Sequence, residues 1–246
     1  LPYAELPSYA ALKDSGLEHV LNYAGRPNLV GVFRGTGGGR TLLLNGHMDT
    51  VGVAGMSEPF RPRLENGRLY GRGAYDMKGG LAACLVAAAE AARRQLRGDV
   101  IVAAVADEEY AGLGTLSIAG RYRADGAIVA EPTELQLVVA HKGFLWLEVE
   151  TEGVAAHGSR PHLGVDAIVK MGGVLAGLDQ LADGLGRRPQ HPLLGPPSIH
   201  ASTISGGGEW STYPDRCALA IERRLLPGET GDAAEAEVRA IVDRLA

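Results

Sequence analysis

The amino-acid sequence predicts an α/β domain over residues 1–142, followed by a smaller α+β domain over residues 143–246. In the first domain, continuous apolar runs alternate with helical segments, which is the pattern of an α/β sheet. In the second, strands alternate apolar and polar residues, as half-exposed antiparallel strands do. The chain has 246 residues, 46% of them hydrophobic and 22% charged, so it can bury a core of ordinary globular type.

The strands of the first domain are expected at four places. Residues 29–35 and 41–47 read as two strands joined by the turn TGGGR. Residues 99–109 form an apolar run that ends in two glutamates, and residues 126–134 form another that ends in an acid. We interpret both runs as buried strands whose carboxyl ends lie at a site.

The helices of the first domain lie between these strands. Residues 67–80, GRLYGRGAYDMKGG, are expected to form a glycine-rich loop that runs directly into a helix. That helix covers LAACLVAAAEAARRQL, which is rich in alanine and leucine, the residues that favour helices most. A short helix is expected over GLGTLSIAGRY, residues 112–122.

The second domain reads as strand, helix, two strands, helix. The strands are expected at residues 144–153, 199–207 and 216–226, and the first helix at residues 166–185. The last segment, residues 231–246, has apolar positions at helical spacing and is predicted to be amphipathic. This order is a split βαβ pattern, of the ferredoxin-like kind, and we expect the domain to lack its last strand.

Composition excludes two classes of partner. The formal net charge is −5 and no cluster of Lys and Arg is placed to follow phosphates, so we expect no nucleic acid. No run approaches the roughly 20 apolar residues of a membrane span.

The two cysteines, Cys84 and Cys217, lie in apolar surroundings without metal or redox spacing. We expect buried thiols and a cytoplasmic protein.

Histidine and carboxylate side chains recur where the predicted strands or the glycine-rich segment end. They are His47 and Asp49, Asp76, the pair Glu108 and Glu109, and Glu131. The carboxyl ends of strands in an open α/β sheet face one crevice. A single aspartate at such a place is usually a cap or turn residue, but four places that hold only His, Asp and Glu indicate a shared site.

The residue types indicate a metal site. Imidazole and carboxylates are good ligands for divalent zinc. Asp76 could bridge two ions, because each of its oxygens can accept a metal. Two ions roughly 3.5–4 Å apart can bind an attacking hydroxide and polarise a carbonyl group. Adjacent side chains of a strand point to opposite faces, so Glu108 and Glu109 cannot both be ligands if the strand continues. One would then bind metal and the other act as general base.

Four segments in this order, GHMDTV, GRLYGRGAYDMKGG, ADEEYAGLGT and IVAEPTE, resemble the zinc-dependent peptidase and deacylase family of acetylornithine deacetylase, succinyl-diaminopimelate desuccinylase and carboxypeptidase G. The resemblance runs from about residue 28 to the end. It implies a zinc-exopeptidase-like catalytic domain with a mixed sheet, a lid domain that dimerises, and two divalent metal ions. Zinc is expected first, with cobalt or manganese as alternatives.

The resemblance also implies the metal ligands. By this likeness His47 and Glu131 bind one ion, and Glu109 binds the second. Asp76 would bridge both ions. Glutamate at position 131, followed by Pro-Thr, resembles the acetylornithine deacetylase side of the family more than the aminopeptidase side.

Two further catalytic roles follow from the same likeness. Glu108 would be the general base, and Asp49 would accept a hydrogen bond from the His47 ring and fix its orientation. Both roles are expectations of the resemblance and not of the spacing alone.

The second domain carries two more family segments. GVAAHGSRPHLGVDAI resembles the lid, whose motif histidine aligns with His157 and stabilises the tetrahedral oxyanion, often in the partner subunit. YPDRCALAIERRLLPGE resembles the strand with the arginine that binds the substrate carboxylate. Alignment on Pro214 selects Arg224 over Arg223. Ser211 stands where the family usually has asparagine.

The predicted function is a metal-dependent hydrolase of amino-acid metabolism that cleaves the amide bond of a small N-acyl amino acid, as a homodimer formed through the lid. One alternative is a carboxypeptidase or dipeptidase of the same family. Another is a truncated or degenerate member, inactive in this form, that only binds or dimerises. The family's second metal-binding histidine, near its C-terminus, has no counterpart before Ala246. Nucleotide binding is disfavoured, because GRGAYDMKGG has neither the phosphate-loop nor the dinucleotide spacing.

Overall fold

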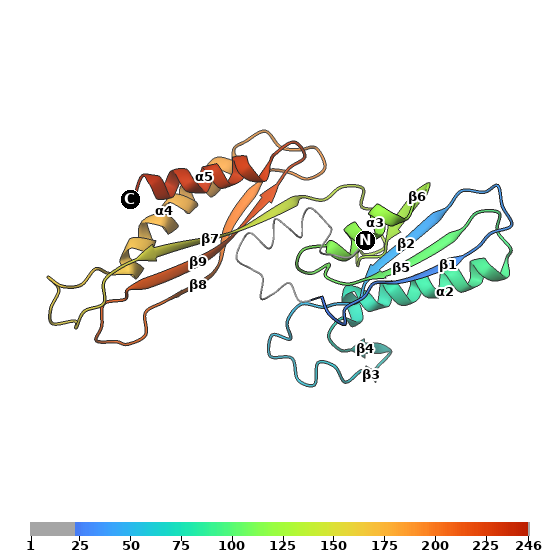
Figure 1. Ribbon diagram of the computed structural model, residues 1–246, viewed down its shortest axis with the longest axis horizontal. Coiled ribbons are helices and arrows are strands. Elements are labelled where there is room, and N and C mark those ends of the chain that lie inside the picture. The colour runs from blue at the N-terminus through green and yellow to red at the C-terminus, as the bar shows by residue number, and fades with distance from the viewer. Residues whose placement is uncertain (1–22, 246) are drawn as a thin grey trace. The chain divides into compact units, whose positions relative to one another are not determined.

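The computed structural model describes residues 23–245, and the chain divides into two compact units (Figure 1). The first unit ends at Leu137 and the second begins at Val138. The boundary predicted from the sequence, between residues 142 and 143, falls just inside the second unit. Each unit has its own sheet and its own hydrophobic core.

The first unit is built on a four-stranded mixed sheet in the order β1-β5-β2-β6. The strands are β1 (Leu29–Phe33), β2 (Leu42–His47), β5 (Val100–Val105) and β6 (Gly126–Val129). β2 is parallel to both β5 and β6, and β1 is antiparallel to β5. The predicted mixed α/β sheet is therefore confirmed. β1 and β2 are consecutive in the chain but are separated by β5, so the TGGGR segment does not close a hairpin.

Two helices pack against this sheet from opposite faces (Figure 1). Helix α2 (Gly79–Arg93) shares a core with Val100 and Val102, whereas α3 (Leu113–Arg121) packs its Ile118 with Ala103 and Val105. Side chains of a strand alternate between faces, so the even and odd positions of β5 serve the two helices. Both helices were predicted, and the burial of β5 on both faces explains its continuous apolar run.

Three expectations for the first unit need correction. Strand β5 ends at Val105, before the glutamates that were assigned to its end. The segment read as a loop contains the strand Arg68–Tyr70 (β4), paired with Arg63–Glu65 (β3), and the short helical turn Ala74–Lys78 (η3). Strand β6 was predicted to be buried, but all four residues are exposed in the described chain, because it is an edge strand of the sheet.

The second unit contains a three-stranded antiparallel sheet with two helices on one face (Figure 1). Its elements in order are β7 (Gly143–Glu152), α4 (Ala167–Gly186), β8 (Ser198–Gly206), β9 (Arg216–Leu225) and α5 (Gly231–Asp243). The sheet order is β7-β9-β8. The predicted order of strand, helix, two strands and helix is confirmed.

Alternation along β9 separates the two faces of this sheet. Cys217, Leu219 and Ile221 are buried in the core with the helices. Arg223 points the same way and is only 1% exposed, while Arg224 lies on the open face. Both helices begin at side-chain caps, since Asp166 accepts a hydrogen bond from the Val169 N–H and Thr230 from the Ala233 N–H.

Two predictions from composition can be compared with the structure. Cys84 and Cys217 are both free and buried, as expected. Between residues 23 and 245, no helix has the length and apolar character needed to cross a membrane.

Candidate metal centre

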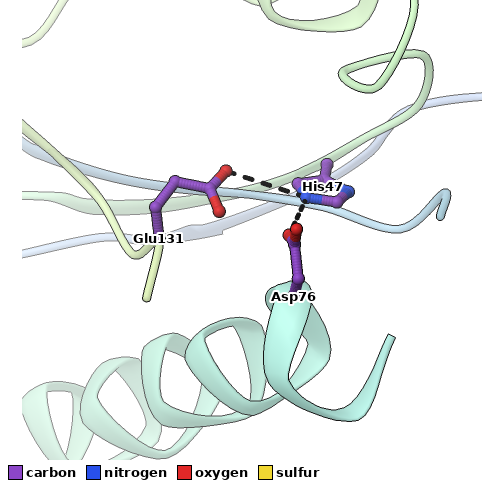
Figure 2. Close-up of side chains that lie close together, drawn as sticks. All are labelled: His47, Asp76 and Glu131. Atoms are coloured by element: carbon purple, nitrogen blue, oxygen red, sulfur yellow. Dashed lines mark hydrogen bonds and ion pairs between the residues drawn. The ribbon is translucent and has the colours of Figure 1, made fainter. Parts of the chain in front are cut away.

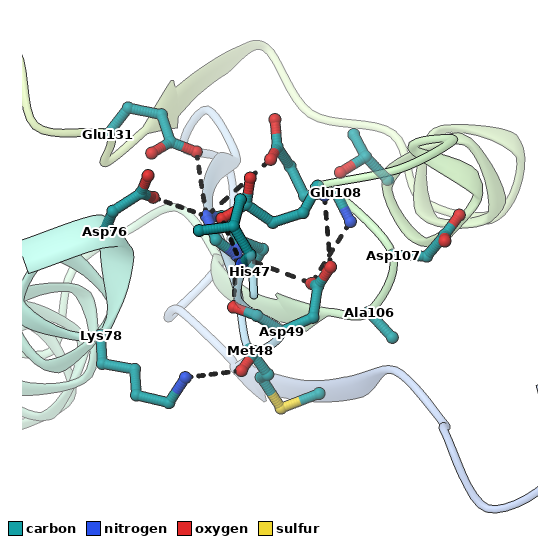
Figure 3. Close-up of polar contacts among 12 residues, drawn as sticks. His47, Met48, Asp49, Asp76, Lys78, Ala106, Asp107, Glu108 and Glu131 are labelled. Carbon is teal, nitrogen blue, oxygen red and sulfur yellow. Dashed lines mark hydrogen bonds and ion pairs between the residues drawn. The ribbon is translucent and has the colours of Figure 1, made fainter. Parts of the chain in front are cut away.

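The predicted acidic site lies at the carboxyl edge of the first-unit sheet (Figure 3). His47 is the last residue of β2, and Glu131 lies two residues after β6. Glu108 and Glu109 lie in the turn after β5, and Asp76 lies in the turn before α2. Because β2, β5 and β6 are parallel, their carboxyl ends bring these side chains together.

One group of possible ligands consists of His47, Asp76 and Glu131 (Figure 2). The Nε2 atom of His47 lies 3.0 Å from Asp76 Oδ1 and 3.7 Å from Glu131 Oε1. One ligand atom from each residue lies within 4.8 Å of the others, close enough to share a cation. The histidine side chain is 1% exposed, so its ring is held in a defined orientation.

A second group consists of His47, Glu108 and Glu109, with ligand atoms again within 4.8 Å of one another. Glu108 Oε2 lies 3.9 Å from His47 Nε2. The expectation that these glutamates point to opposite faces assumed that the strand continues. It does not, because β5 ends at Val105 and Asp107 turns the chain with a φ of 69°. Both carboxylates are therefore directed toward the histidine.

Asp49 contacts the site in a way that differs in part from the prediction. The Nδ1 atom of His47 lies 3.0 Å from the backbone carbonyl oxygen of Asp49 and 3.6 Å from its carboxylate. The carboxylate instead accepts hydrogen bonds from the backbone N–H groups of Glu108 and Glu109, at 3.3 and 3.2 Å. Asp49 thus orients the histidine through its main chain and fixes the glutamate turn through its side chain.

Small residues allow the segments of the site to approach closely. A Cβ atom on Gly46 would lie 2.8 Å from the Met77 side chain, and one on Gly80 would lie 2.0 Å from the carbonyl oxygen of Ala130. These contacts bring the turn with Asp76 against β2, and the start of α2 against the residue before Glu131. Glycine is required at position 80, where a Cβ would collide with backbone, whereas at position 46 a side chain would force the end of the Met77 side chain to move.

Lys78 makes a hydrogen bond at this site that was not predicted from the sequence. Its Nζ atom donates a hydrogen bond to the carbonyl oxygen of Met48 at 2.7 Å (Figure 3). This bond links the turn before α2 to the chain that leaves β2. The segment DMKGG contains the lysine, but no spacing rule connects it with Met48, which is 30 residues away.

The carboxylates that lie close together shift the pKa values of the site. Burial by itself would lower the pKa of His47, but the hydrogen bond with Asp76 and the neighbouring carboxylates outweigh it and raise the pKa. Burial is the largest cause that raises the pKa of Glu108 and Glu131, and the other carboxylates add to it while His47 opposes it. The crowded carboxylates would be stabilised by a cation.

The donor set fits a divalent metal ion. One imidazole nitrogen and several carboxylate oxygens match the ligand preference of zinc, and similar sets hold cobalt or manganese. Because Nδ1 of His47 faces a carbonyl oxygen, Nε2 is the nitrogen that faces the carboxylates and would bind the ion.

The two remaining predicted residues lie in the second unit. His157 forms a backbone bridge with Thr212, and its Nδ1 lies 2.8 Å from Ser159 Oγ. Arg224 is on the open face of the sheet with its side chain 43% exposed. Arg223 is buried and paired with two glutamates, so of the two arginines it is Arg224 that is accessible to a ligand.

The match to a known protein family extends across both units. The model of peptidase family M20/M25/M40 matches residues 43–241. The chain belongs to the M20 peptidase family. This M20 chain is 35% identical over 245 residues to N-formyl-4-amino-5-aminomethyl-2-methylpyrimidine deformylase of Bacillus subtilis (strain 168), covering 91% of the chain and 57% of the relative. It is 38% identical over 224 residues to acetylornithine deacetylase of Myxococcus xanthus, covering 89% and 57%.

A solved structure shows the fold of this M20 chain. An M20 family metallo-carboxypeptidase from Sulfolobus solfataricus superposes with a TM-score of 0.70 at 18% identity, covering 96% of this chain and 70% of that one. At that identity the likeness shows the fold alone. The chain spans 57% of the length of the two curated relatives.

Proposed function

We propose that this protein is a metal-dependent hydrolase that cleaves the amide bond of a small N-acyl amino acid. The observation that carries the proposal is the arrangement around His47, whose Nε2 lies 3.0 Å from Asp76 and 3.7 Å from Glu131 while Nδ1 is held by the Asp49 carbonyl. The names of the two curated relatives, a deformylase and a deacetylase, support removal of an acyl group.

In this proposal the site holds two divalent ions, with zinc preferred and cobalt or manganese as alternatives. His47 and Glu131 would bind one ion, Glu109 the other, and Asp76 both. The ligand atoms of His47, Asp76 and Glu131 lie within 4.8 Å of one another, and so do those of His47, Glu108 and Glu109. When bound, the ions supply electrophilic polarisation of the amide carbonyl and of a water molecule.

Glu108 is proposed as the general base. It takes a proton from the attacking water and passes it to the leaving amine. Its side chain is 46% exposed, and its Oε2 atom lies 3.9 Å from His47 Nε2, so the carboxylate is close to the ligand group and accessible from solvent. Asp49 holds the turn that carries Glu108, through the backbone hydrogen bond at 3.3 Å.

The second unit contributes two residues to the proposal. His157 stabilises the oxyanion of the tetrahedral intermediate, and Arg224 binds the substrate carboxylate with its planar guanidinium. Homodimerisation through the second unit and a cytoplasmic location complete the proposal. The roles of His157 and Arg224 are supported by the resemblance of the motifs, and that of Arg224 also by its exposed side chain.

The second candidate is a carboxypeptidase or dipeptidase, which is supported by the match to a family model described as a peptidase family. Rates on N-acetyl-L-ornithine, succinyl-diaminopimelate and unblocked dipeptides separate the two. A chain that only binds or dimerises would turn over none of them.

The deciding experiment is metal analysis and kinetics of the natural protein with Glu108→Gln, with Glu65→Gln on the exposed β3–β4 hairpin as control. We expect bound zinc, cobalt or manganese in all three proteins and a loss of turnover of about 10²–10⁴-fold in Glu108→Gln alone. Near-normal turnover of Glu108→Gln would contradict the general-base role. A protein without any of these metals would contradict the function.

A further inference from the structure

The open face of the second-unit sheet carries a connected set of side chains next to Arg224. Trp146 Nε1 donates a hydrogen bond to Glu222 Oε2 at 3.0 Å, and Arg224 Nε donates to Glu222 Oε1 at 2.5 Å. The two oxygens of one carboxylate therefore join the tryptophan to the arginine. Trp146 and Glu222 are direct partners in the register of β7 and β9.

The Phe144 ring lies beside the Arg224 guanidinium. It is the register partner of Arg224 on β7, and the guanidinium carbon lies 5.6 Å from the centre of its ring. The rings of Phe144 and Trp146 are themselves in contact, with centres 5.1 Å apart. Arg224 thus lies between an aromatic surface and a carboxylate, within reach of cation–π attraction.

This arrangement leaves the terminal nitrogens of Arg224 for a ligand. In the described part of the chain, the ion pair of Arg224 is made by Nε, and 43% of the side chain is exposed. The neighbouring Arg223 differs, because it uses Nε and a terminal nitrogen on glutamates and is 1% exposed. Arg223 is therefore paired inside the unit, whereas Arg224 has terminal N–H groups that can donate hydrogen bonds to a ligand.

Glu222 is suited to hold the Arg224 side chain in one orientation. Burial would raise its pKa, but the hydrogen bonds from Trp146 and Arg224 and the nearby positive charges outweigh burial and lower the pKa. The carboxylate therefore stays ionised, and its side chain is only 13% exposed. A long flexible arginine needs such a partner if it is to meet a carboxylate with both terminal nitrogens in one geometry.

We infer that Glu222 and Trp146 are positioning residues, which orient the Arg224 guanidinium so that its terminal nitrogens bind the substrate carboxylate. The inference rests on the proposed function, in which Arg224 binds that group. An ordinary exposed ion pair would not need the tryptophan, whose indole N–H is directed at the second oxygen of the same carboxylate.

Kinetics on a matched pair of substrates test the inference in the natural protein. The substrates are N-acetyl-L-ornithine and its C-terminal carboxamide, which lacks the charge. We expect Arg224→Lys to remove most of the preference for the carboxylate. Glu222→Gln should raise KM for N-acetyl-L-ornithine by about tenfold with kcat changed less than about twofold, because it removes binding and not chemistry. The carboxamide should be affected little.

Two further variants complete the design. Trp146→Phe keeps an aromatic ring but removes the indole N–H, and should also raise KM, by a smaller factor. Combined with Glu222→Gln it should add nothing, because both act through one contact. Glu148→Gln, an exposed glutamate on the same face of β7, is the control and should leave KM unchanged.

The outcomes separate this inference from the proposed function. If Arg224→Lys keeps the full preference for the carboxylate, the proposed role of Arg224 is wrong. If Arg224→Lys loses the preference while Glu222→Gln and Trp146→Phe keep normal KM values, Arg224 binds the carboxylate unaided and the positioning inference is overturned.

A spectroscopic readout does not depend on turnover. The chain has two tryptophans, and the other, Trp210, is fully exposed. In a nitrogen–proton correlation spectrum of the natural protein, the indole N–H signals of Trp146 and Trp210 are assigned by Trp146→Phe and Trp210→Phe. Glu222→Gln should shift the Trp146 signal, and N-acetyl-L-ornithine should shift it in the wild type but not in Arg224→Lys, with Trp210 as internal reference. A Trp146 signal that Glu222→Gln leaves in place would overturn the inference.

Discussion

The carboxylate of Asp49 accepts a hydrogen bond from the backbone N–H of Glu109 at 3.2 Å. A side chain that follows β2 thereby holds the turn that follows β5, and the neighbouring N–H of Glu108 is held in the same way at 3.3 Å. The two parallel strands are joined just beyond their last paired residues, His47 and Val105. The position of both glutamates relative to the histidine therefore depends on Asp49.

We predict that Asp49→Ala weakens metal binding by about 10–100-fold, the usual effect of removing a group that orients ligands. The measurement is competition with a chelator of known affinity. Asp125→Ala is the control, because it also removes a carboxylate that accepts a backbone N–H, that of Thr41, away from the site. Equal losses of affinity in both variants would show that Asp49 contributes only to stability.

A second prediction concerns Gly80. Its Cβ would lie 2.0 Å from the carbonyl oxygen of Ala130, so Gly80→Ala must separate the start of α2 from the segment that carries Glu131. We expect a loss of about 1–3 kcal/mol in the free energy of unfolding, together with weaker metal binding.

Gly172→Ala provides the contrast. It lies inside α4, and a Cβ there has open space, so this variant should gain up to about 1 kcal/mol. Chemical denaturation measures both variants. A Gly80→Ala protein as stable as the wild type would mean that the contact between α2 and residue 130 is not as close as described.

A third prediction concerns the buried arginine of the second unit. Glu229 pairs with Arg223 at 2.9 Å. Burial would raise the pKa of Glu229, but the hydrogen bonds from the Leu226 N–H and Arg223, with nearby arginine charges, outweigh it and lower the pKa. Because the pKa is lower in the folded state, the stabilisation is present above the unfolded-state pKa and is lost as pH falls through the folded-state pKa.

Glu229→Gln should therefore cost about 1–3 kcal/mol at neutral pH, the range for a buried donor that loses its partner. The difference from wild type should shrink as the pH falls below the ordinary glutamate pKa of 4.5. Urea denaturation across this pH range is the measurement. Glu235→Gln, which breaks the surface pair with Arg239, should change stability little at any pH. A Glu229→Gln deficit that is independent of pH would contradict the ionic explanation.

A fourth prediction concerns metal and pH. The carboxylates around His47 raise its pKa, so in the metal-free protein the ring keeps its proton to a higher pH than an ordinary histidine. Protons then compete with the ion, and zinc affinity should fall as the pH is lowered, with proton release on binding. Calorimetry in buffers of different ionisation enthalpy measures this release. His47→Ala should abolish binding of the ion that His47 holds, whereas His162→Ala, on an exposed loop, should leave it intact.

Most secondary structure could be predicted, because local patterns carry it. The alanine and leucine run became α2, and the alternating residues of β7 and β9 became antiparallel strands with one buried face. Two of the errors came from strand pairing, which is not local. The neighbour of β1 is β5 and not β2, and β6 is exposed because its place in the described sheet is at the edge.

The residue types by themselves determined that the ends of the strands carry metal-ligand chemistry, and the structure places His47, Asp76, Glu108, Glu109 and Glu131 together. Their catalytic roles remain predictions. Only the tertiary structure decided how the two glutamates are directed, because that depends on where β5 stops and on the turn that Asp49 holds. It also decided that Arg223 is buried and Arg224 accessible, since alternation along a strand assigns opposite faces but only the packed helices determine which face is covered.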